Sequence, residues 1–292
     1  MPRETRLVPI LLAVLSATVH GQASHALSFN PKPPVRVNQI SRSEILMLVP
    51  PGAQQLGDTL TVEALRLESM TQYVDAADTD RFLIELHYDS LRSRMRPVGG
   101  VWLELEASET EMAVVRVLLD RHLRVLEAQF VDRPDLRASR AHMTRGLAGS
   151  IRPTLPEGPV AIGDSWSTDV AFALSQLRSI GREEGVPADG ELLSNANAVL
   201  DSALIRGAET LYYVTVRGSF IPANFTATLG DQETVVSVGG SLAAMMIWSS
   251  TWNAFVSSAS RVVLDMDVRD PTSRDPGSTV RFDITTNTQV RR

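Results

Sequence analysis

Apolar and polar residues alternate with a period of two along much of this 292-residue chain. Apolar residues occupy the even positions of 82–88, while Glu85, His87 and Asp89 lie between or beside them, and the segment 280–290 has a similar pattern. Because successive side chains of a strand point to opposite faces of a sheet, this pattern predicts strands with one buried and one solvated face. Further strands are expected over 45–49, 60–64, 101–106, 113–119, 123–130, 166–174, 198–206, 211–220, 234–248 and 254–268.

The alternation is interrupted at mid-chain by the stretch Leu155–Trp166, which has the sequence LPEGPVAIGDSW. Pro156 and Pro159 each fix φ and lack a backbone N–H group, so neither a helix nor a central strand is expected to continue through them. Gly163 tolerates positive φ just before the alternation resumes. The stretch is therefore predicted to be a rigid connection between two β-rich halves, with Trp166 buried where they meet.

The halves are assigned to residues 44–154 and 155–292, and their layouts are similar enough to suggest a weak internal duplication. Predicted hairpin turns at 120–122 and 250–253 are the main points of similarity. One helix is expected near 134–148, because Asp132 suits an N-cap, Pro134 suits a first helical turn, and apolar residues recur at near-helical spacing. The predicted fold is mainly β and antiparallel, with this helix directly before the mid-chain connection.

The N-terminus has the features of a secretory signal peptide, assigned to residues 1–26. Arg3 and Arg6 precede the uncharged apolar run Leu7–Val19, which is too short to span a bilayer comfortably, and small residues follow between positions 21 and 26. Residues 27–43, which include the proline-rich segment 30–34, are expected to form a tether. No transmembrane segment is expected after cleavage, so the mature protein is predicted to be soluble and either periplasmic or secreted.

Composition removes several classes of function. The net charge is −6 and the arginines are scattered, so nucleic acid is not an expected partner. The chain has no cysteine, which excludes disulfides, thiolate metal sites, a cysteine nucleophile and a lipidated N-terminal cysteine. It also has no phosphate-binding glycine motif, and no cofactor is expected.

The mid-chain stretch also supports a family resemblance. Pro156, Pro159, Val160 and the run 163–166 match the pattern P-x-x-P-V-x-x-G-D-S-W. The chain thereby resembles a family of exported bacterial β-rich proteins of unknown function. That family is in turn similar to the curved antiparallel half-barrels of periplasmic lipoprotein carriers such as LolA and LppX. The resemblance implies a large curved, half-barrel-like sheet and carries over no catalytic residues. Many relatives begin with a lipidated cysteine, which this chain lacks.

The sequence contains residues for three kinds of catalytic or metal site, and none of the three is favoured. The run 163–166 is similar to the serine block of GDSL esterases, but all five histidines precede Ser165, and no strand feeding a helix surrounds it. Glu85, His87 and Asp89 share one strand face without forming a metal-ligand signature. The carboxylate pairs at 104/106 and 265/267 lie two residues apart on single strands, where an exposed polar row explains them better than glycosidase chemistry.

The remaining functional candidate is an apolar ligand groove formed by Met245, Trp248 and Phe255, because methionine and aromatic side chains commonly line such grooves. The alternative is that these residues belong to the protein's own core. The sequence thus favours a non-enzymatic periplasmic binding or carrier module for an apolar ligand or a polypeptide. A structural or interaction protein of the cell envelope, without a small-molecule pocket but with an envelope protein as partner, is the main alternative. A hydrolase is a distant third.

Overall fold

The computed structural model describes residues 23–32, 35–49, 60–106, 112–132, 153–173, 191–229, 232–269 and 277–291. The regular elements in these ranges are all strands, which confirms that the protein is mainly β. The helix predicted near 134–148 lies outside the described residues. The strands are β1 (Val35–Val49), β2 (Leu60–Ala76), β3 (Arg81–Pro97), β4 (Leu103–Leu105), β5 (Val115–Asp120), β6 (Val125–Phe130), β7 (Ser165–Ala173), β8 (Glu191–Arg206), β9 (Glu209–Leu229), β10 (Gln232–Ser249), β11 (Ala254–Arg269) and β12 (Ser278–Arg291).

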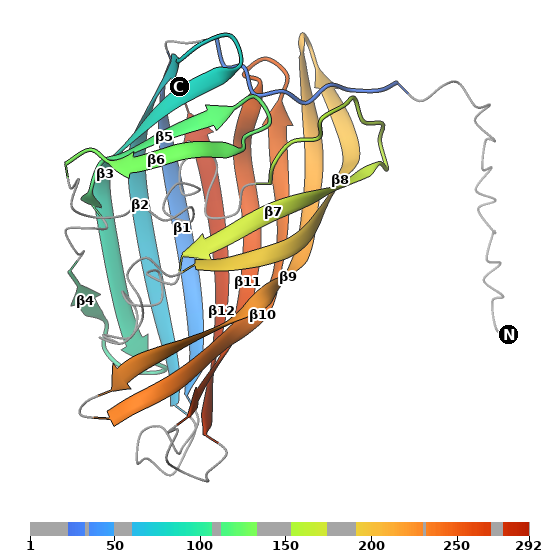
Figure 1. Cartoon of the computed structure of the whole chain (residues 1–292). Coiled ribbons are helices and arrows are strands. Elements are labelled where there is room, and N and C mark those ends of the chain that lie inside the picture. Colours follow the sequence, from blue (N-terminus) through green and yellow to red (C-terminus); the bar gives the residue numbers. More distant parts are fainter. Residues whose placement is uncertain are drawn as a thin grey trace, which may run out of the picture.

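All twelve strands belong to one antiparallel sheet that is not closed (Figure 1). Its order is β6-β5-β3-β2-β1-β12-β11-β10-β9-β8-β7, with the short β4 pairing only with β3. The first and last long strands meet at the centre, where Asn38–Leu48 of β1 pairs with Arg291–Arg281 of β12. The two predicted halves therefore share one continuous sheet, and β6 and β7 are its edges.

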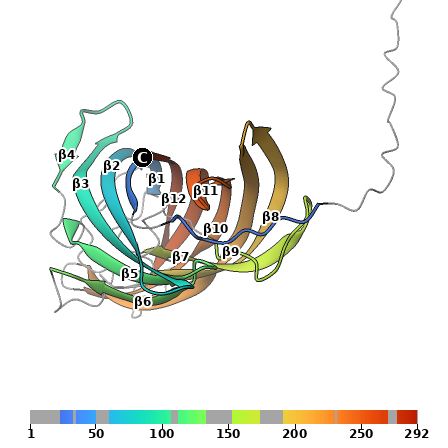
Figure 2. The same ribbon diagram turned by 90° about the horizontal axis from the view of Figure 1, so that it is seen from above.

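The sheet is strongly curved, so that edge strands β6 and β7 lie on the same side of the molecule (Figures 1 and 2). Four of the long strand pairs change register within their length, at Ser69/Met70, Leu200/Ser202, Val238/Gly240 and Ile247/Trp248. Such bulges bend a strand and increase its local twist. They help strands of up to 21 residues to curve.

The alternation seen in the sequence separates the two faces of this sheet. We call the buried face the inner face and the opposite one the outer face. On β12, Val280, Phe282 and Ile284 are buried on the inner face, and Arg281 and Asp283 point outward. Burying the inner apolar rows supplies the main favourable free energy of folding. No helix in the described ranges is long and apolar enough to cross a bilayer.

Residues 23–32 pack against the rim of the sheet, in contrast to the tether predicted for residues 27–43. Leu27 and Phe29 are only 2% and 1% exposed, and Phe29 makes an edge-to-face contact with Phe82, with 5.0 Å between ring centroids. The His25 N–H donates to the Val160 carbonyl at 2.7 Å, and the Val160 N–H donates back at 2.9 Å. Strand β1 then begins at Val35. The prediction extended too far because only the prolines near 31–34 oppose strand formation, and the alternation resumes directly after them.

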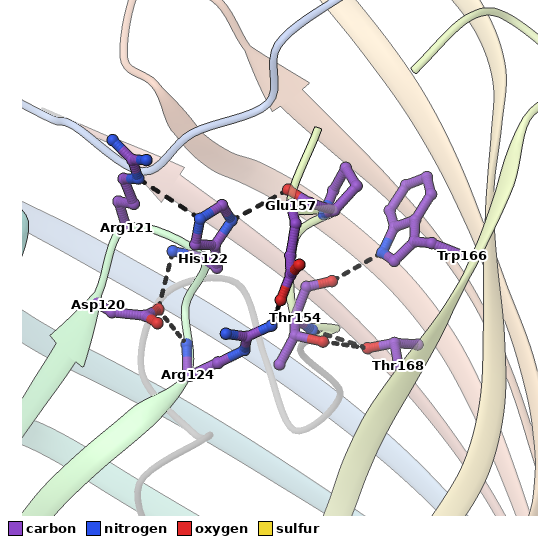
Figure 3. Close-up of polar contacts among 9 residues, drawn as sticks. Asp120, Arg121, His122, Arg124, Thr154, Glu157, Trp166 and Thr168 are labelled. Carbon is purple, nitrogen blue, oxygen red and sulfur yellow. Dashed lines mark hydrogen bonds and ion pairs between the residues drawn. The ribbon is translucent and has the colours of Figure 1, made fainter. Parts of the chain in front are cut away.

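The mid-chain connection joins the two edges of the sheet and is held in place by polar contacts (Figure 3). The Leu155 N–H donates to the carbonyl of His122 in the β5–β6 turn at 2.8 Å, and the His122 ring contacts the Pro156 carbonyl at 3.0 Å. The Trp166 indole N–H donates to the Thr154 carbonyl at 2.8 Å. Trp166 is half-buried against the core, so it anchors the start of β7 less deeply than the sequence predicted.

Candidate ligand-binding face

The structure brings together two of the three residues predicted to line a groove. Trp248 and Phe255 face each other across the β10–β11 pair, each 1% exposed, with their rings edge to face and 5.0 Å between centroids. Met245 is 49% exposed on the outer face of β10, and its neighbour Met246 is the buried one. The three side chains therefore do not line a common surface, and the aromatic pair belongs to the inner-face core.

The inner face contains a second feature, a polar band that crosses five neighbouring strands. We use this name for the following nine residues on β3, β2, β1, β12 and β11: Ser93, Arg66, Glu68, Ser41, Ser43, Thr286, Thr288, Ser258 and Ser260. Seven of them are buried, from Thr288 at 1% exposed to Ser93 at 9%. Polar residues of these types are usually exposed, so the band requires an explanation.

Strand register places these residues side by side. Ser41 pairs with Glu68 of β2 on one side and with Thr288 of β12 on the other, and Thr288 pairs in turn with Ser258 of β11. In the adjacent row, Ser43 pairs with Arg66 of β2 on one side and with Thr286 of β12 on the other. Directly paired residues of antiparallel strands point to the same face, so the band is continuous across the sheet.

Hydrogen bonds within the band connect neighbouring strands. The hydroxyl groups of Ser41 and Thr288 are 3.0 Å apart, and those of Ser43 and Thr286 are 2.9 Å apart. On β2 the Arg66 guanidinium donates to the Glu68 carboxylate at 2.6 Å in a nearly buried ion pair.

A pair of buried glutamines extends this network. The Gln72 side-chain amide donates to the Gln39 amide oxygen at 2.7 Å, and the Gln39 amide donates to the Ser41 hydroxyl at 3.3 Å. Gln72 is 0% exposed, and its own amide oxygen has no hydrogen-bond partner within the described part of the chain. An unsatisfied buried acceptor costs roughly 1–3 kcal/mol. A polar donor brought to this position would remove that cost.

The band lies between apolar rows of the same strands. Below it, Ile45 of β1 pairs with Ile284 of β12 and Ala64 of β2. Above it, Met70 of β2 and Val290 of β12 flank Gln39. A hydroxyl group can donate one hydrogen bond and accept two. The polar band is thus flanked on both sides by apolar side chains of the same strands.

The residues considered for catalysis remain apart from one another. Ser165 begins β7 and pairs with Val199, and the described structure shows no histidine hydrogen-bonded to its hydroxyl. His122 instead contacts the carbonyl of Pro156. A serine nucleophile needs a base within hydrogen-bond reach, so the structure shows no arrangement of that kind at Ser165.

The charged residues of β3, for which a solvated polar strand face was favoured over a metal site, form an outer-face network of ion pairs and hydrogen bonds. Glu85 accepts from Arg116 at 2.7 Å and contacts His87 at 2.6 Å, whereas Asp89 accepts from the Thr71 hydroxyl. Hydrogen bonding by Arg116, and secondarily by His87, holds the pKa of Glu85 below its ordinary value despite partial burial. No group of three potential metal ligands occurs in the described ranges.

The carboxylate pairs also remain on the outer face. Asp265 lies 3.5 Å from Arg281, and Asp267 accepts from the Thr279 hydroxyl at 2.5 Å. Glu104 and Glu106 are exposed. These contacts agree with the exposed polar row inferred from the sequence.

The polar band was missed in the sequence, although a signal for it is present. The inward row of β12 changes from Ile284 to Thr286 and Thr288 before returning to Val290, and the inward row of β1 changes similarly at Ser41 and Ser43. Within one strand, two such residues are unremarkable. The signal becomes meaningful only when the same interruption is found at corresponding positions of several paired strands.

Comparisons with known proteins give only distant structural likenesses. No protein-family model matches the chain, and no curated protein matches it. Among solved structures, an outer membrane channel from Pseudomonas putida F1 is 8% identical and has a TM-score of 0.20, with 92% of this chain and 97% of the channel covered. OpdQ from Pseudomonas aeruginosa is 6% identical with a TM-score of 0.17, and the match covers 88% of this chain and 97% of OpdQ.

Proposed function

We propose that this protein is an exported, non-enzymatic binding or carrier module of the bacterial envelope that holds an apolar ligand or an apolar polypeptide segment. The inner face of the curved sheet is the proposed binding face. The observation that supports this most directly is the polar band, with Ser41 and Thr288 at its centre, between apolar rows.

Stability alone gives no reason for such a band. Burying a hydroxyl is costly unless it is hydrogen-bonded, and a buried ion pair such as Arg66–Glu68 is often no more stabilising than well-packed apolar residues. Apolar side chains at these positions would also continue the rows on either side. A ligand with an apolar body and one polar group accounts for both features, because its polar group would bind at the band and its apolar parts at the flanking rows.

The main alternative remains an interaction protein of the envelope, in which the inner face is only a core. The two functions differ in what the purified protein carries. We propose isolating the protein from the periplasm of its own host, followed by native mass spectrometry and organic-solvent extraction. A carrier is expected to retain an added mass that extraction releases. Protein that carries no added mass, and that binds no fatty acid or apolar peptide on titration, would contradict the proposal.

A matched pair of variants locates the binding face. Ser41→Ala removes a hydroxyl from the polar band, and Ser241→Ala removes one from the exposed outer face of β10. We expect Ser41→Ala to reduce the retained ligand and Ser241→Ala to leave it unchanged. Equal ligand retention in both variants would exclude the band as the binding site. Labelling of Ser165 by a fluorophosphonate probe would contradict the non-enzymatic part of the proposal.

A further inference from the structure

A groove of about 610 Å³ lies on the outer face, on the other side of the sheet from the polar band. It crosses β3, β2, β1, β12 and β11, and its volume is within the usual range of small-molecule sites. With neighbouring strands about 4.8 Å apart, four spacings make it roughly 19 Å long, which suits a chain of linked units better than a single small molecule.

Trp102 forms one wall of this groove and is fixed in position by two arginines. The central guanidinium carbon of Arg94 lies 4.6 Å from the ring centroid, and that of Arg96 lies 4.4 Å from it. Arg96 is itself held by Glu63 at 2.8 Å. The indole remains half-exposed and lines the groove. Because its position is already determined, stacking a ligand on it would cost little ordering entropy.

The charges that line the groove cancel one another. Three arginines and three carboxylates contribute to its surface. Arg42 pairs with Glu44 at 2.7 Å, and both side chains are well exposed. At the β11–β12 end of the groove Arg261 donates to Asp283 at 2.8 Å, and hydrogen bonding from Arg261 lowers the pKa of Asp283. The groove therefore has no net charge with which to attract an ion.

These features restrict the chemistry of a ligand. An anion would meet the carboxylates that are bound to Arg42 and Arg261, and a cation would be repelled by those arginines. A purely apolar ligand would remove water from three ion pairs at a large cost in free energy. A neutral molecule rich in hydroxyl groups avoids both penalties, since each hydroxyl both donates and accepts. Guanidinium and carboxylate groups retain further donor and acceptor sites, and their planar shape suits two adjacent hydroxyls.

We propose that this outer groove binds a neutral oligosaccharide. The C–H groups of one sugar ring pack against the exposed part of the Trp102 indole, beside the two guanidinium groups, and the apolar floor provided by Leu46 and Leu65 contacts the rest of the saccharide. The hydroxyls bind two pairs of ion-paired side chains, Arg42 with Glu44 at the middle of the groove and Arg261 with Asp283 at its β11–β12 end. This site is separate from the inner face and does not depend on the carrier function.

The test uses maltohexaose, cellohexaose and chitohexaose as neutral probes, with heparin and hexalysine as charged ones. Calorimetric titration of the full mature chain is expected to show binding of at least one neutral hexasaccharide, weakened at least about tenfold in Trp102→Ala. Met245→Ala, an exposed outer-face change on β10 outside the groove, is the matched control and is expected to bind like wild type. Thermal melting of Trp102→Ala checks that it is folded.

Three results would overturn the proposal. These are failure of all three neutral probes to bind at about 1 mM, tighter binding of heparin or hexalysine than of any neutral probe, and saccharide binding unaffected in folded Trp102→Ala. The inner-face variant Ser41→Ala separates the two proposals, because it is expected to leave saccharide binding unchanged. Loss of a carried apolar ligand in that variant would bear on the carrier function alone.

Discussion

Removing the Trp166 side chain should destabilise the protein by an amount that its contacts allow us to estimate. Its indole N–H donates to the Thr154 carbonyl at 2.8 Å, and the ring is half-buried against the core. Truncating a fully buried tryptophan to alanine costs about 3–5 kcal/mol, so a half-buried ring corresponds to about 1.5–2.5 kcal/mol. The lost hydrogen bond adds about 1 kcal/mol. We therefore expect Trp166→Ala to lower the free energy of unfolding by about 2.5–3.5 kcal/mol.

Two further variants separate these contributions. Trp166→Phe keeps most of the apolar contact and should cost about 1 kcal/mol, mainly through the lost hydrogen bond to Thr154. Trp102→Ala removes a half-exposed ring with two cation–π contacts on the outer face, and should cost about 1–2 kcal/mol. The loss in the free energy of unfolding is thus expected to be largest for Trp166→Ala. It should be smaller for Trp102→Ala, and for Trp166→Phe it should be no larger than for Trp102→Ala.

The assay is urea unfolding followed by far-UV circular dichroism, since this signal does not depend on the tryptophan removed. Equal m-values would show that the midpoint shifts report stability. A typical domain has about 5–15 kcal/mol of stability, so the expected shift for Trp166→Ala is large enough to measure. If Trp166→Ala unfolds within about 1 kcal/mol of wild type, the indole does not hold the mid-chain connection and the argument from Figure 3 is wrong.

Three other predictions concern different parts of the chain. N-terminal sequencing of exported protein should find a new N-terminus within residues 21–26, whereas protein that keeps Met1 would contradict export. Gly240→Ala should destabilise the protein strongly, because the φ of Gly240 is +155° and a Cβ there would lie 2.0 Å from a β11 carbonyl oxygen. Gly239→Ala is the control, since the atom nearest to its Cβ would lie at an ordinary 3.8 Å. Equal melting temperatures of the two variants would refute this prediction. The pKa of Glu85 is lowered in the folded state, so its carboxylate stabilises the fold at pH values above the ordinary pKa of 4.5. This contribution is lost as the pH falls from 4.5 through the lowered pKa. In Arg116→Met the Glu85 pKa should rise toward 4.5 in an NMR titration, and an unchanged value would show that Arg116 is not its cause.

Much of the local structure was readable from residue order. The period of two near Phe82 and Phe282 predicted strands with the correct buried face, because that choice depends only on the residues of the strand itself. The prolines at 156 and 159 likewise marked a connection, since their effect on the backbone is local. The antiparallel arrangement of the strands was also predicted from these patterns.

Two predictions were wrong, the groove shared by Met245 and Trp248 and the start of the tether, because each depends on contacts that the local sequence does not specify. Met245 and Trp248 were assigned to one groove because methionine and aromatic side chains commonly line such sites, but the alternation along β10 places Met245 on the outer face. Residues 27 and 29 were assigned to a tether because nothing nearby in the sequence indicates their partners. Phe29 packs on Phe82, and the N–H of Phe29 donates to the Arg121 carbonyl, so both partners are more than 50 positions away.

The sequence by itself determined which residues form strands and which face of each strand is apolar, because both depend on neighbours along the chain. Only the tertiary structure decided which strands lie side by side and in what register. Ser41 and Thr288 are separated by 247 positions, and their hydroxyls meet because β1 pairs with β12 in one register. A shift of one residue would have placed Ser41 opposite an outward residue. The polar band and the outer groove both arise from that long-range pairing, so neither could be assembled from the strands taken one at a time.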